Sequence, residues 1–293
     1  MQLKNIVAVV TGASRGAGRG IAVALGSYGC TVYVTGRSER PTDAPTVGDV
    51  RLPGTIYETA DAVTAAGGKG IPVRVDHSNE DEIAALFARV AKEQGKLDIL
   101  VNNAWPNADQ MTAPGTFWEK PANLIDMLDV GVRGTYIACW HAAPLLIKSS
   151  RGLVVFTSAS GAAHYVFGPV YGAHKASLDK FAADMAVDFR DHNVASISIW
   201  MGTLLTERMR AMIELDPERF GHLLDTAETP EFTGHVIWGM YCDQQLMDKS
   251  GQTLIGAELA EEYGIKDEGD RQPPSYRYLL GVYPHRQFDE IIR

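Results

Sequence analysis

Residues 6–20 read Ile-Val-Ala-Val-Val-Thr-Gly-Ala-Ser-Arg-Gly-Ala-Gly-Arg-Gly, an apolar run that passes directly into a glycine-rich turn. The run at 6–10 predicts a buried strand, and the residues after the turn predict a helix over about 18–28 that ends at Gly29. A second strand, at 31–35, follows at once. Together these segments form a βαβ unit, whose short apolar strands are typical of a parallel sheet covered on both faces.

The same alternation continues along most of the chain. Further helices are expected at 57–66, 80–94, 124–147, 170–191 and 233–243, and further strands at 70–75, 97–101, 152–157, 194–200 and 253–255. We therefore predict an α/β fold, a single doubly wound Rossmann-type parallel sheet with helices on both faces. One catalytic domain is expected to cover residues 1–260.

Two segments lie outside this alternation. Residues 39–54 are polar and interrupted by three prolines, so they are predicted to be an inserted loop without regular structure. Residues 261–293 are predicted to be a C-terminal tail, which is charged over 266–275 and contains Pro273-Pro274. The tail either packs on a neighbour or is an exposed terminus, and the exposed terminus is favoured.

The glycines of the first turn, at positions 12, 16 and 18, have the spacing Gly-x-x-x-Gly-x-Gly. Such glycines let the backbone approach a pyrophosphate while the next helix points its N-terminal amides toward it. A tight turn without a ligand is the alternative, but the complete βαβ context favours a dinucleotide site, and the missing Gly-Lys-[Ser/Thr] ending excludes a P-loop. The expected cofactor contacts in this turn are Gly12, Ser14, Arg15, Gly16 and Gly18.

The turn after the second strand bears on which nucleotide is bound. A carboxylate about 20 residues beyond the glycines holds the ribose 2′-hydroxyl of NAD, whereas Gly36-Arg37-Ser38 occupies that turn here. A carboxylate repels a 2′-phosphate and a guanidinium binds it bidentately, so Arg37, with Arg15 as a second cation, predicts NADP(H). The alternative is that Arg37 is a solvated loop charge, because Glu39 follows two residues later.

A tyrosine and a lysine in the helix expected at 170–191 are candidates for proton transfer. Tyr171 and Lys175 stand at i and i+4, so they project from one face about a turn apart. An ammonium group beside a phenol lowers the phenol pKa from about 10 toward the range in which the hydroxyl exchanges a proton. This pair is common by chance, but Ser158 lies just past a strand, in the crevice where open α/β sheets bind ligands.

These motifs together resemble the short-chain dehydrogenase/reductase family over residues 5–256. The matching residues are Thr11-Gly12-x-x-x-Gly16-x-Gly18, Asn102-Asn103-Ala104, Ser158, Tyr171-x-x-x-Lys175, and Gly202 with Thr206. The resemblance implies that Ser158 holds the carbonyl oxygen, that Tyr171 is the general acid or base, and that Lys175 lowers the Tyr171 pKa and binds the nicotinamide ribose. It also implies cofactor-binding or supporting roles for Asp76 at the adenine, Asn102 in the central sheet, Ala104, Gly202 and Thr206.

Three residues depart from the family pattern. Gly131 stands where most members have a catalytic asparagine that supports a water-mediated proton relay. Trp105 replaces the glycine that usually follows Asn-Asn-Ala, and Met201 replaces the proline usually found before Gly202. The first change is expected to slow the enzyme or to shift the relay to a backbone carbonyl or water, and the others to reshape the pocket beside the nicotinamide.

Several stretches resemble one branch of the family, called dehydrogenase/reductase family member one. They are Phe117-Trp118-Glu119, Val130-Gly131-x-Arg133-Gly134, Ser198-Ile199-Trp200 and Leu259-Ala260-x-x-Tyr263-Gly264. The inserted loop, with Leu52-Pro53-Gly54-Thr55-Ile56-Tyr57, looks more like hydroxysteroid dehydrogenase-like proteins. The resemblance to this branch implies NADPH-dependent reduction of steroid or xenobiotic carbonyls.

Composition excludes several other classes. Among 293 residues, 27 Lys and Arg stand against 36 Asp and Glu, so the net charge of −9 argues against a nucleic-acid partner. Apolar runs are too short to span a bilayer, no secretory signal precedes the first strand, and a cytoplasmic location is expected. The three cysteines lack a CxxC pair and are expected to be small core residues without a disulfide or zinc.

Other signals are weaker. His164 and His174 are candidates to lie near Tyr171 and contact the substrate, but packing or surface positions are favoured for both, and the histidines show no spacing that indicates a metal. Gly-x-Ser-x-Gly is not met at Ser158 or Ser160, which argues against a serine hydrolase. A further set is expected either to line an apolar pocket or to serve the core: Trp105, Phe167, Trp200, Leu204 and Leu205.

The leading hypothesis is an enzyme that moves hydride between NADP(H) and a hydrophobic ketone, aldehyde or secondary alcohol. A nucleotide-binding regulator or scaffold without turnover is the alternative suggested by Gly131, and a methyltransferase on a similar sheet is a third possibility. The helices at 124–147 and 170–191 form the subunit interface in many relatives, so a homodimer or homotetramer is expected. The residues do not indicate the substrate or the direction of the reaction.

Overall fold

The computed structural model describes residues 5–106, 110–288 and 290–292. Within this part of the chain, seven strands form one parallel sheet in the order β5-β2-β1-β6-β7-β8-β9. The strands are β1 (Val7–Val10), β2 (Thr31–Gly36), β5 (Lys69–Arg74), β6 (Ile99–Asn102), β7 (Gly152–Ser158), β8 (Val194–Trp200) and β9 (Thr253–Ile255). The order reverses at β1 and β6, which makes the sheet doubly wound and places a crevice at their carboxyl ends.

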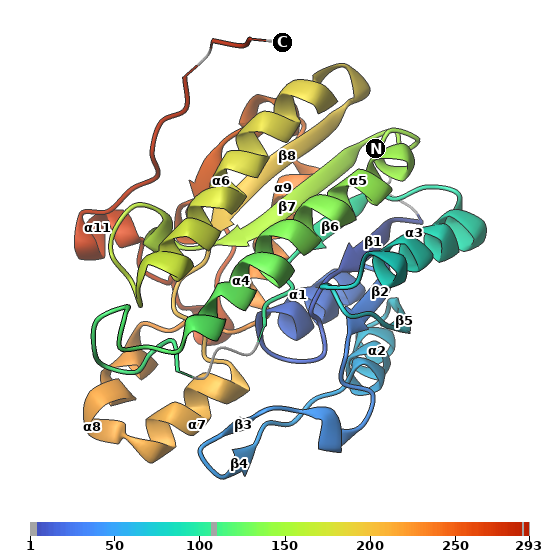
Figure 1. The fold of residues 1–293 in the computed structure, drawn as a ribbon. Coiled ribbons are helices and arrows are strands. Elements are labelled where there is room, and N and C mark those ends of the chain that lie inside the picture. Colours follow the sequence, from blue (N-terminus) through green and yellow to red (C-terminus); the bar gives the residue numbers. More distant parts are fainter. Residues whose placement is uncertain (1–4, 107–109, 289, 293) are drawn as a thin grey trace.

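Helices cover both faces of the sheet, as predicted (Figure 1). One face packs against α1 (Gly16–Ser27), α2 (Ile56–Ala65), α9 (Phe232–Cys242) and α10 (Gly256–Tyr263). The other face packs against α3 (Glu80–Gln94), α5 (Gly134–Leu146) and α6 (Pro169–Phe189). Alternate residues of β1 supply the two cores, since Ala8 and Val10 belong to the first and Val7 and Val9 to the second. The predicted fold class is therefore confirmed.

The inserted loop is more regular than expected. Instead of an irregular loop, residues 39–54 contain a one-turn helix at Pro41–Asp43 and a small antiparallel hairpin of β3 (Thr46–Val47) and β4 (Val50–Arg51). Gly48 takes a φ of +55° in the turn between these strands. Hydrogen bonds from Arg51 to the carbonyls of Thr42 and Ala44 close the loop, and the prolines lie outside the two strands.

The helix expected at 124–147 is interrupted. It begins as a single turn, Ala122–Ile125, continues through α4 (Asp126–Leu128) and a π-helical turn at Asp129–Arg133, and becomes α5 only at Gly134. Such π-helical turns concentrate at functional sites. After β8, two further helices, α7 (Glu207–Leu215) and α8 (Pro217–Phe220), were not predicted, and α7 contacts β3 of the inserted loop.

The C-terminal segment differs from the favoured exposed terminus. Helix α10 runs across residue 260, and Asp267 and Ser275 beyond it are 6% and 3% exposed. Asp267 accepts hydrogen bonds from the main chain and hydroxyl of Thr229, which fasten the segment to the domain. Only beyond α11 (Tyr276–Leu280) does the chain leave the body of the molecule (Figure 1). The division between domain and tail at residue 260 stays a prediction.

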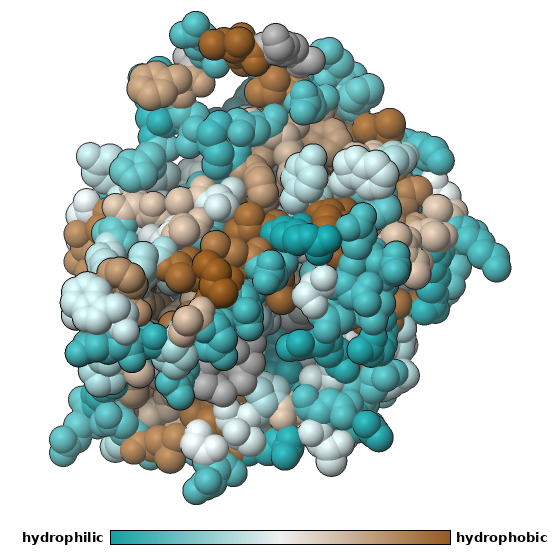
Figure 2. All heavy atoms as spheres, viewed as in Figure 1, coloured by the Kyte–Doolittle hydropathy of each residue, from teal (hydrophilic) through white to brown (hydrophobic). Residues whose placement is uncertain are grey.

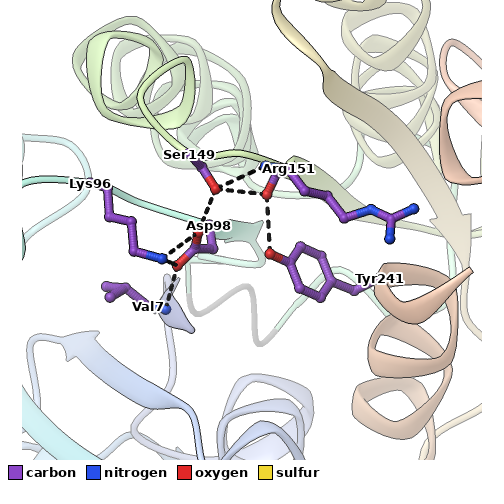
Figure 3. A network of polar contacts seen from close by, with 6 residues as sticks. All are labelled: Val7, Lys96, Asp98, Ser149, Arg151 and Tyr241. Carbon is purple, nitrogen blue, oxygen red and sulfur yellow. Dashed lines mark hydrogen bonds and ion pairs between the residues drawn. The ribbon is translucent and has the colours of Figure 1, made fainter. Parts of the chain in front are cut away.

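A buried carboxylate joins the amino ends of the strands, at the edge of the sheet away from the crevice (Figure 3). Asp98, which is 1% exposed, accepts hydrogen bonds from the Val7 amide at 2.8 Å, from Lys96 Nζ at 2.7 and 2.9 Å and from the Ser149 hydroxyl. The Arg151 carbonyl accepts from Ser149 Oγ at 2.9 Å and from Tyr241 Oη of α9 at 3.1 Å. The network thereby links the starts of β1, β6 and β7 to one helix.

Two cysteines are buried, as expected, but the third is not. Cys30 and Cys139 lie in the core, whereas Cys242 is exposed at the end of α9, where the helix reaches the surface. All three are free thiols.

Candidate active site

A cavity of about 680 Å³ opens at the carboxyl ends of the central strands. All of the residues predicted to bind the cofactor or to transfer the proton line it: Gly12, Ser14, Arg15, Gly16, Gly18, Arg37, Asp76, Asn102, Ala104, Ser158, Tyr171, Lys175, Gly202 and Thr206. These residues come from segments that are far apart in the chain. The sheet brings them together because the carboxyl ends of parallel strands lie on one edge.

The glycine turn is shaped by close backbone contacts. Gly12 has a φ of +64°, and a Cβ at this position would lie 2.7 Å from the Cα of Ala104. A Cβ at Gly18 would lie 2.3 Å from the carbonyl oxygen of Gly12. The Asn103 side chain, whose role the sequence analysis missed, donates to the carbonyls of Thr11 and Gly12 at 3.0 and 3.2 Å. The turn therefore admits only glycine at positions where a pyrophosphate needs close backbone approach.

The N-terminus of α1 already holds an anionic side chain. The carboxylate of Glu207, the first residue of α7, accepts a hydrogen bond from the Gly16 amide at 2.9 Å. Amides at a helix N-terminus favour negative charge through their dipoles and their unpaired N–H groups. The Gly16 amide therefore already hydrogen-bonds a carboxylate, and this contact places the start of α7 against the glycine turn.

The two arginines predicted to bind a 2′-phosphate are held differently. Arg15 donates to the carbonyls of Pro53 and Gly54 and to Ser38 Oγ, so it ties the glycine turn to the inserted loop. Its burial lowers the pKa of this guanidinium. Arg37 is 56% exposed in its side chain and lies 3.7 Å from a carboxylate oxygen of Asp76. The pKa of Asp76 is lowered, although burial opposes the shift, because hydrogen bonds from Ser78 and the charges of Arg37 and Arg74 outweigh it.

Tyr171 and Lys175 both enter the cavity from α6. Lys175 Nζ lies 5.8 Å from the centre of the Tyr171 ring and donates to the Thr157 carbonyl at 3.0 Å. Burial lowers the pKa of Lys175 to about 8, against the raising effect of Asp179. Burial raises the pKa of Tyr171 above its ordinary value, with a smaller contribution from Tyr276. The expected lowering of the Tyr171 pKa by Lys175 is therefore not seen, because burial and Tyr276 both raise it.

Ser158 is the last residue of β7 and is fully buried. Its hydroxyl donates to the main-chain carbonyl of Lys175 at 3.2 Å, so in this structure it is engaged with α6 rather than with Tyr171. Asp179, one turn after Lys175, accepts from Ser198 Oγ at 2.6 Å and from Trp200 Nε1 at 2.9 Å. These bonds fix the part of α6 that carries the tyrosine and lysine against β8.

Asn102 lies beneath the cavity at the end of β6. Its Nδ2 donates to Cys139 Sγ of α5 at 3.3 Å, and its carbonyl accepts from Thr157 Oγ1 at 3.3 Å. These contacts join β6, β7 and α5.

The apolar candidates divide between cavity and core. Trp105, Phe167 and Leu204 line the cavity, together with Met111 and Met201. Trp200 is instead fully buried in a small core cluster with Ile255 and Ala257. The cavity wall around Tyr171 is thus largely apolar, because the rings of Trp105 and Phe167 lie 5.8 and 5.3 Å from the Tyr171 ring.

Two further residues near the site gave no sequence signal. Glu228, which is 1% exposed, accepts a hydrogen bond from the Gly202 amide at 3.1 Å, and burial raises its pKa to about 8. Tyr276 of α11 hydrogen-bonds the side chain of Thr203, and burial raises its pKa. Both residues hold the segment after β8 from outside the sheet. Their positions depend on how the C-terminal third packs, which no local pattern in the sequence indicates.

A dinucleotide-sized cleft at the switch point of a doubly wound sheet, with a tyrosine and a lysine on one helix facing it, defines a class of oxidoreductases. The model of the short chain dehydrogenase family matches residues 6–216, and the chain belongs to this family.

Similar proteins indicate which branch of the family the chain resembles. Dehydrogenase/reductase SDR family member 1 of Homo sapiens is 37% identical over 290 residues, which cover 95% of this chain and 88% of that protein. Hydroxysteroid dehydrogenase-like protein 2 of Danio rerio is 29% identical over 269 residues, covering 91% of this chain and 60% of that protein. The predicted likeness to the first of these branches is confirmed.

Solved structures show the same fold. A short chain dehydrogenase of Mycobacterium thermoresistibile superposes with a TM-score of 0.74 at 25% identity and covers 92% of both chains. A short chain dehydrogenase of Mycobacterium paratuberculosis bound to NAD has a TM-score of 0.69 at 22% identity, with 87% of this chain and 97% of that chain covered.

Two features are absent from the residues that the structure describes. None of their helices combines the length and apolar character that a bilayer crossing requires. They also contain no group of three or more His, Cys, Asp or Glu side chains arranged to hold a metal ion.

Proposed function

We propose that this chain is an NADP(H)-dependent oxidoreductase that acts on a hydrophobic ketone, aldehyde or secondary alcohol, of steroid or xenobiotic type. The observation that carries the proposal is one cavity that contains both the glycine turn and the Tyr171–Lys175 pair. The glycine turn supports a dinucleotide, because Gly12 and Gly18 let the turn pack against the Ala104 backbone and its own carbonyl, which leaves the main chain of the turn open to a pyrophosphate. The nicotinamide, when bound, supplies or accepts the hydride.

The chain's own part in the reaction is proton transfer. Tyr171 Oη gives its proton to the carbonyl oxygen in reduction and takes one from the alcohol in oxidation. Below a pH of about 8 the Lys175 ammonium group is charged and stabilises the phenolate that reduction leaves behind. For Ser158 to hold the substrate oxygen, its hydroxyl must leave the Lys175 carbonyl by a rotation about χ1.

The walls of the cavity support this substrate class. Trp105 and Phe167 place their rings beside Tyr171, and Leu204 also lines the cavity. Such walls bind an apolar molecule with one carbonyl or hydroxyl group directed toward the tyrosine. The similarity to a hydroxysteroid dehydrogenase-like protein agrees with this class.

Turnover with NADPH tests the proposal. The purified protein should oxidise NADPH in the presence of at least one member of a panel of steroid, terpene and aromatic carbonyls. Tyr171→Phe should lower kcat by about 10²- to 10⁴-fold, because the proton donor is lost. Absence of turnover across the panel, with wild type and Tyr171→Phe alike, would sink the proposal.

A regulator or scaffold that binds NADPH without turnover is the second candidate, and Gly131 at the position of the relay asparagine favours it. It predicts saturable NADPH binding, measured by fluorescence titration, with no carbonyl-dependent oxidation above background.

We also propose a cytoplasmic homodimer or homotetramer. Helix α5 leaves Tyr136, Trp140 and Ile147 at 53%, 65% and 44% exposure, which is typical of a partner surface. Figure 2 shows hydrophobic residues among hydrophilic ones on the face where α5 and α6 lie. Light scattering should give at least twice the mass of one chain, and Trp140→Glu should lower it; a monomeric wild type would contradict this assembly.

A further inference from the structure

Trp105 and Gly131, two residues that differ from the family pattern, lie at one place in the cavity wall, and His174 lies between them. Gly131 is buried in the π-helical turn before α5, and His174 is 2% exposed on α6. The His174 ring lies 5.1 Å from the Trp105 ring, and Lys175 Nζ lies 5.3 Å from that same ring. His174 and Lys175 thus approach one indole from neighbouring positions on the helix, and both line the cavity.

Gly131 and His174 fit each other. A Cβ at position 131 would lie 2.3 Å from His174 Nε2 and 2.5 Å from Cδ2, closer than any side chain tolerates. The indole of Trp105 limits the room into which the imidazole can move. The space that an asparagine side chain at position 131 would need is therefore filled by a ring from another helix.

The surroundings of His174 favour one tautomer. Nε2 is the ring nitrogen that faces Gly131, and the Gly131 backbone raises the His174 pKa, as a carbonyl that accepts from Nε2–H does. Burial and the Lys175 charge outweigh this contact and lower the pKa of His174 to about 2, so the ring is neutral. Nδ1 then carries a lone pair.

That lone pair is unused by the protein. Nδ1 is buried and has no hydrogen-bond partner in the described part of the chain. A buried acceptor without a donor is unfavourable, and His174 lines the cavity, so Nδ1 is a candidate binding point for a water or ligand hydrogen.

We propose that His174 takes the place of the missing relay asparagine as a positioning residue, by accepting at Nδ1 a hydrogen bond from the water that serves Lys175. This inference rests on the proposed function. In reduction, Tyr171 gives a proton to the substrate oxygen and recovers one by way of Lys175, which recovers one from that water and ultimately from bulk solvent. His174 itself neither gains nor loses a proton; it holds the water in line. Gly131 is the complementary change that makes room for the ring.

Two sets of variants test this role. His174→Phe keeps a ring against Trp105 but removes the acceptor, so kcat for carbonyl reduction should fall at least tenfold while KM and the NADPH dissociation constant stay within about twofold. His164→Phe is the matched control, because His164 bonds Ser160 Oγ at 3.0 Å and lies outside the cavity lining; it should keep wild-type kcat. A rise in the solvent isotope effect on kcat for His174→Phe alone is expected from a disturbed relay.

Combined substitutions at positions 131 and 174 give a second test. Gly131→Asn alone should lower the unfolding temperature because of the clash, whereas Gly131→Asn combined with His174→Gly should regain both folding and most of the wild-type kcat. Nitrogen-15 NMR of labelled histidine should show His174 as the neutral Nε2–H tautomer at pH 7, whether or not the enzyme turns over.

The outcomes separate the two proposals. A wild type that turns over while His174→Phe keeps its kcat and isotope effect overturns the relay role alone. A His174 resonance of the Nδ1–H tautomer, or an exchanged pair no better than Gly131→Asn, also overturns it. A wild type that reduces no carbonyl refutes the proposed function, and the relay with it.

Discussion

At the scale of single residues, burial is the main cause of the pKa shifts in this cavity. Lys175 is buried with its ammonium group on the Thr157 carbonyl, and the nearby carboxylate of Asp179 only partly offsets the loss of water. The resemblance implies a lysine that lowers the tyrosine pKa, whereas here burial shifts both groups: it raises the pKa of Tyr171 and lowers that of Lys175. The chemistry of the pair therefore depends on the pH at which Lys175 loses its proton.

Lys175 should give the protein a measurable pH-dependent stability. The unfolded chain holds the Lys175 proton up to a pH of about 10.4, but the folded chain releases it near 8, so the unfolding free energy should rise between these values. The rise amounts to at most about 3 kcal/mol. Urea unfolding of Lys175→Met should lack this rise, and Lys180→Met, an exposed lysine on the same helix, should keep it. Equal pH slopes for wild type and Lys175→Met would contradict the buried charge.

Arg37 is the residue that we expect to decide the cofactor. Arg37→Asp should weaken NADPH binding by about 10- to 100-fold and leave NADH binding nearly unchanged or improved, because a guanidinium is exchanged for a carboxylate beside the 2′-position. Arg40→Asp is the control, since Arg40 pairs with Asp43 and does not line the cavity. Fluorescence titration with both nucleotides measures the ratio; equal losses for both would refute the NADP(H) assignment.

At the scale of elements, α1, α7 and the inserted loop meet at the glycine turn. The first residue of α7 places its carboxylate on the N-terminal amide of α1, and α7 also contacts β3 of the inserted loop. A phosphate that binds the same amide must displace this carboxylate. The inserted loop and α7 thus both lie at the glycine turn of the first βαβ unit.

Glu207→Gln should therefore strengthen NADPH binding. Loss of the charge weakens the competitor at the α1 N-terminus, and the expected gain is about threefold to tenfold in affinity. Glu214→Gln, an exposed residue on the same helix, is the matched control and should not change affinity. Unchanged or weaker binding by Glu207→Gln would show that the carboxylate does not compete.

In the whole molecule, the residues that we expect to stabilise the fold and those that we expect to carry the chemistry lie at opposite ends of the strands. The cavity lies at the carboxyl ends, whereas the Asp98 network fastens the amino ends of three strands to α9 (Figure 3). A change in the network leaves the cavity edge untouched, so folding and turnover should respond independently.

Asp98→Ala should lower the unfolding free energy by about 3 kcal/mol, because the Val7 amide and the Ser149 hydroxyl lose their buried acceptor. Asp98→Asn, which keeps one oxygen, should lose less. Urea unfolding measures both, and kcat of the folded fraction should stay at the wild-type value. A loss below 1 kcal/mol, on the order of one ordinary hydrogen bond, would contradict this role for the network.

Local patterns in the sequence were enough to predict the sheet, most helices and the site residues that line the cavity. Alternation of apolar residues, glycine spacing and the i, i+4 pair act over a few residues, and the parallel sheet then gathers the strand ends at one edge. Local patterns did not reveal the hairpin at 39–54 or α7, whose polar segments carry no clear period.

Contacts between distant segments were decided only by the tertiary structure. Glu207 lies 191 residues from Gly16, Glu228 lies 26 residues from Gly202, and Tyr276 reaches Tyr171 from the C-terminal segment. His174 meets Gly131 across two helices. The sequence by itself determined which groups stand at the ends of the strands, because their order is local. Packing determined which side chains face those groups and how far burial shifts their pKa values, because both depend on the whole chain being folded.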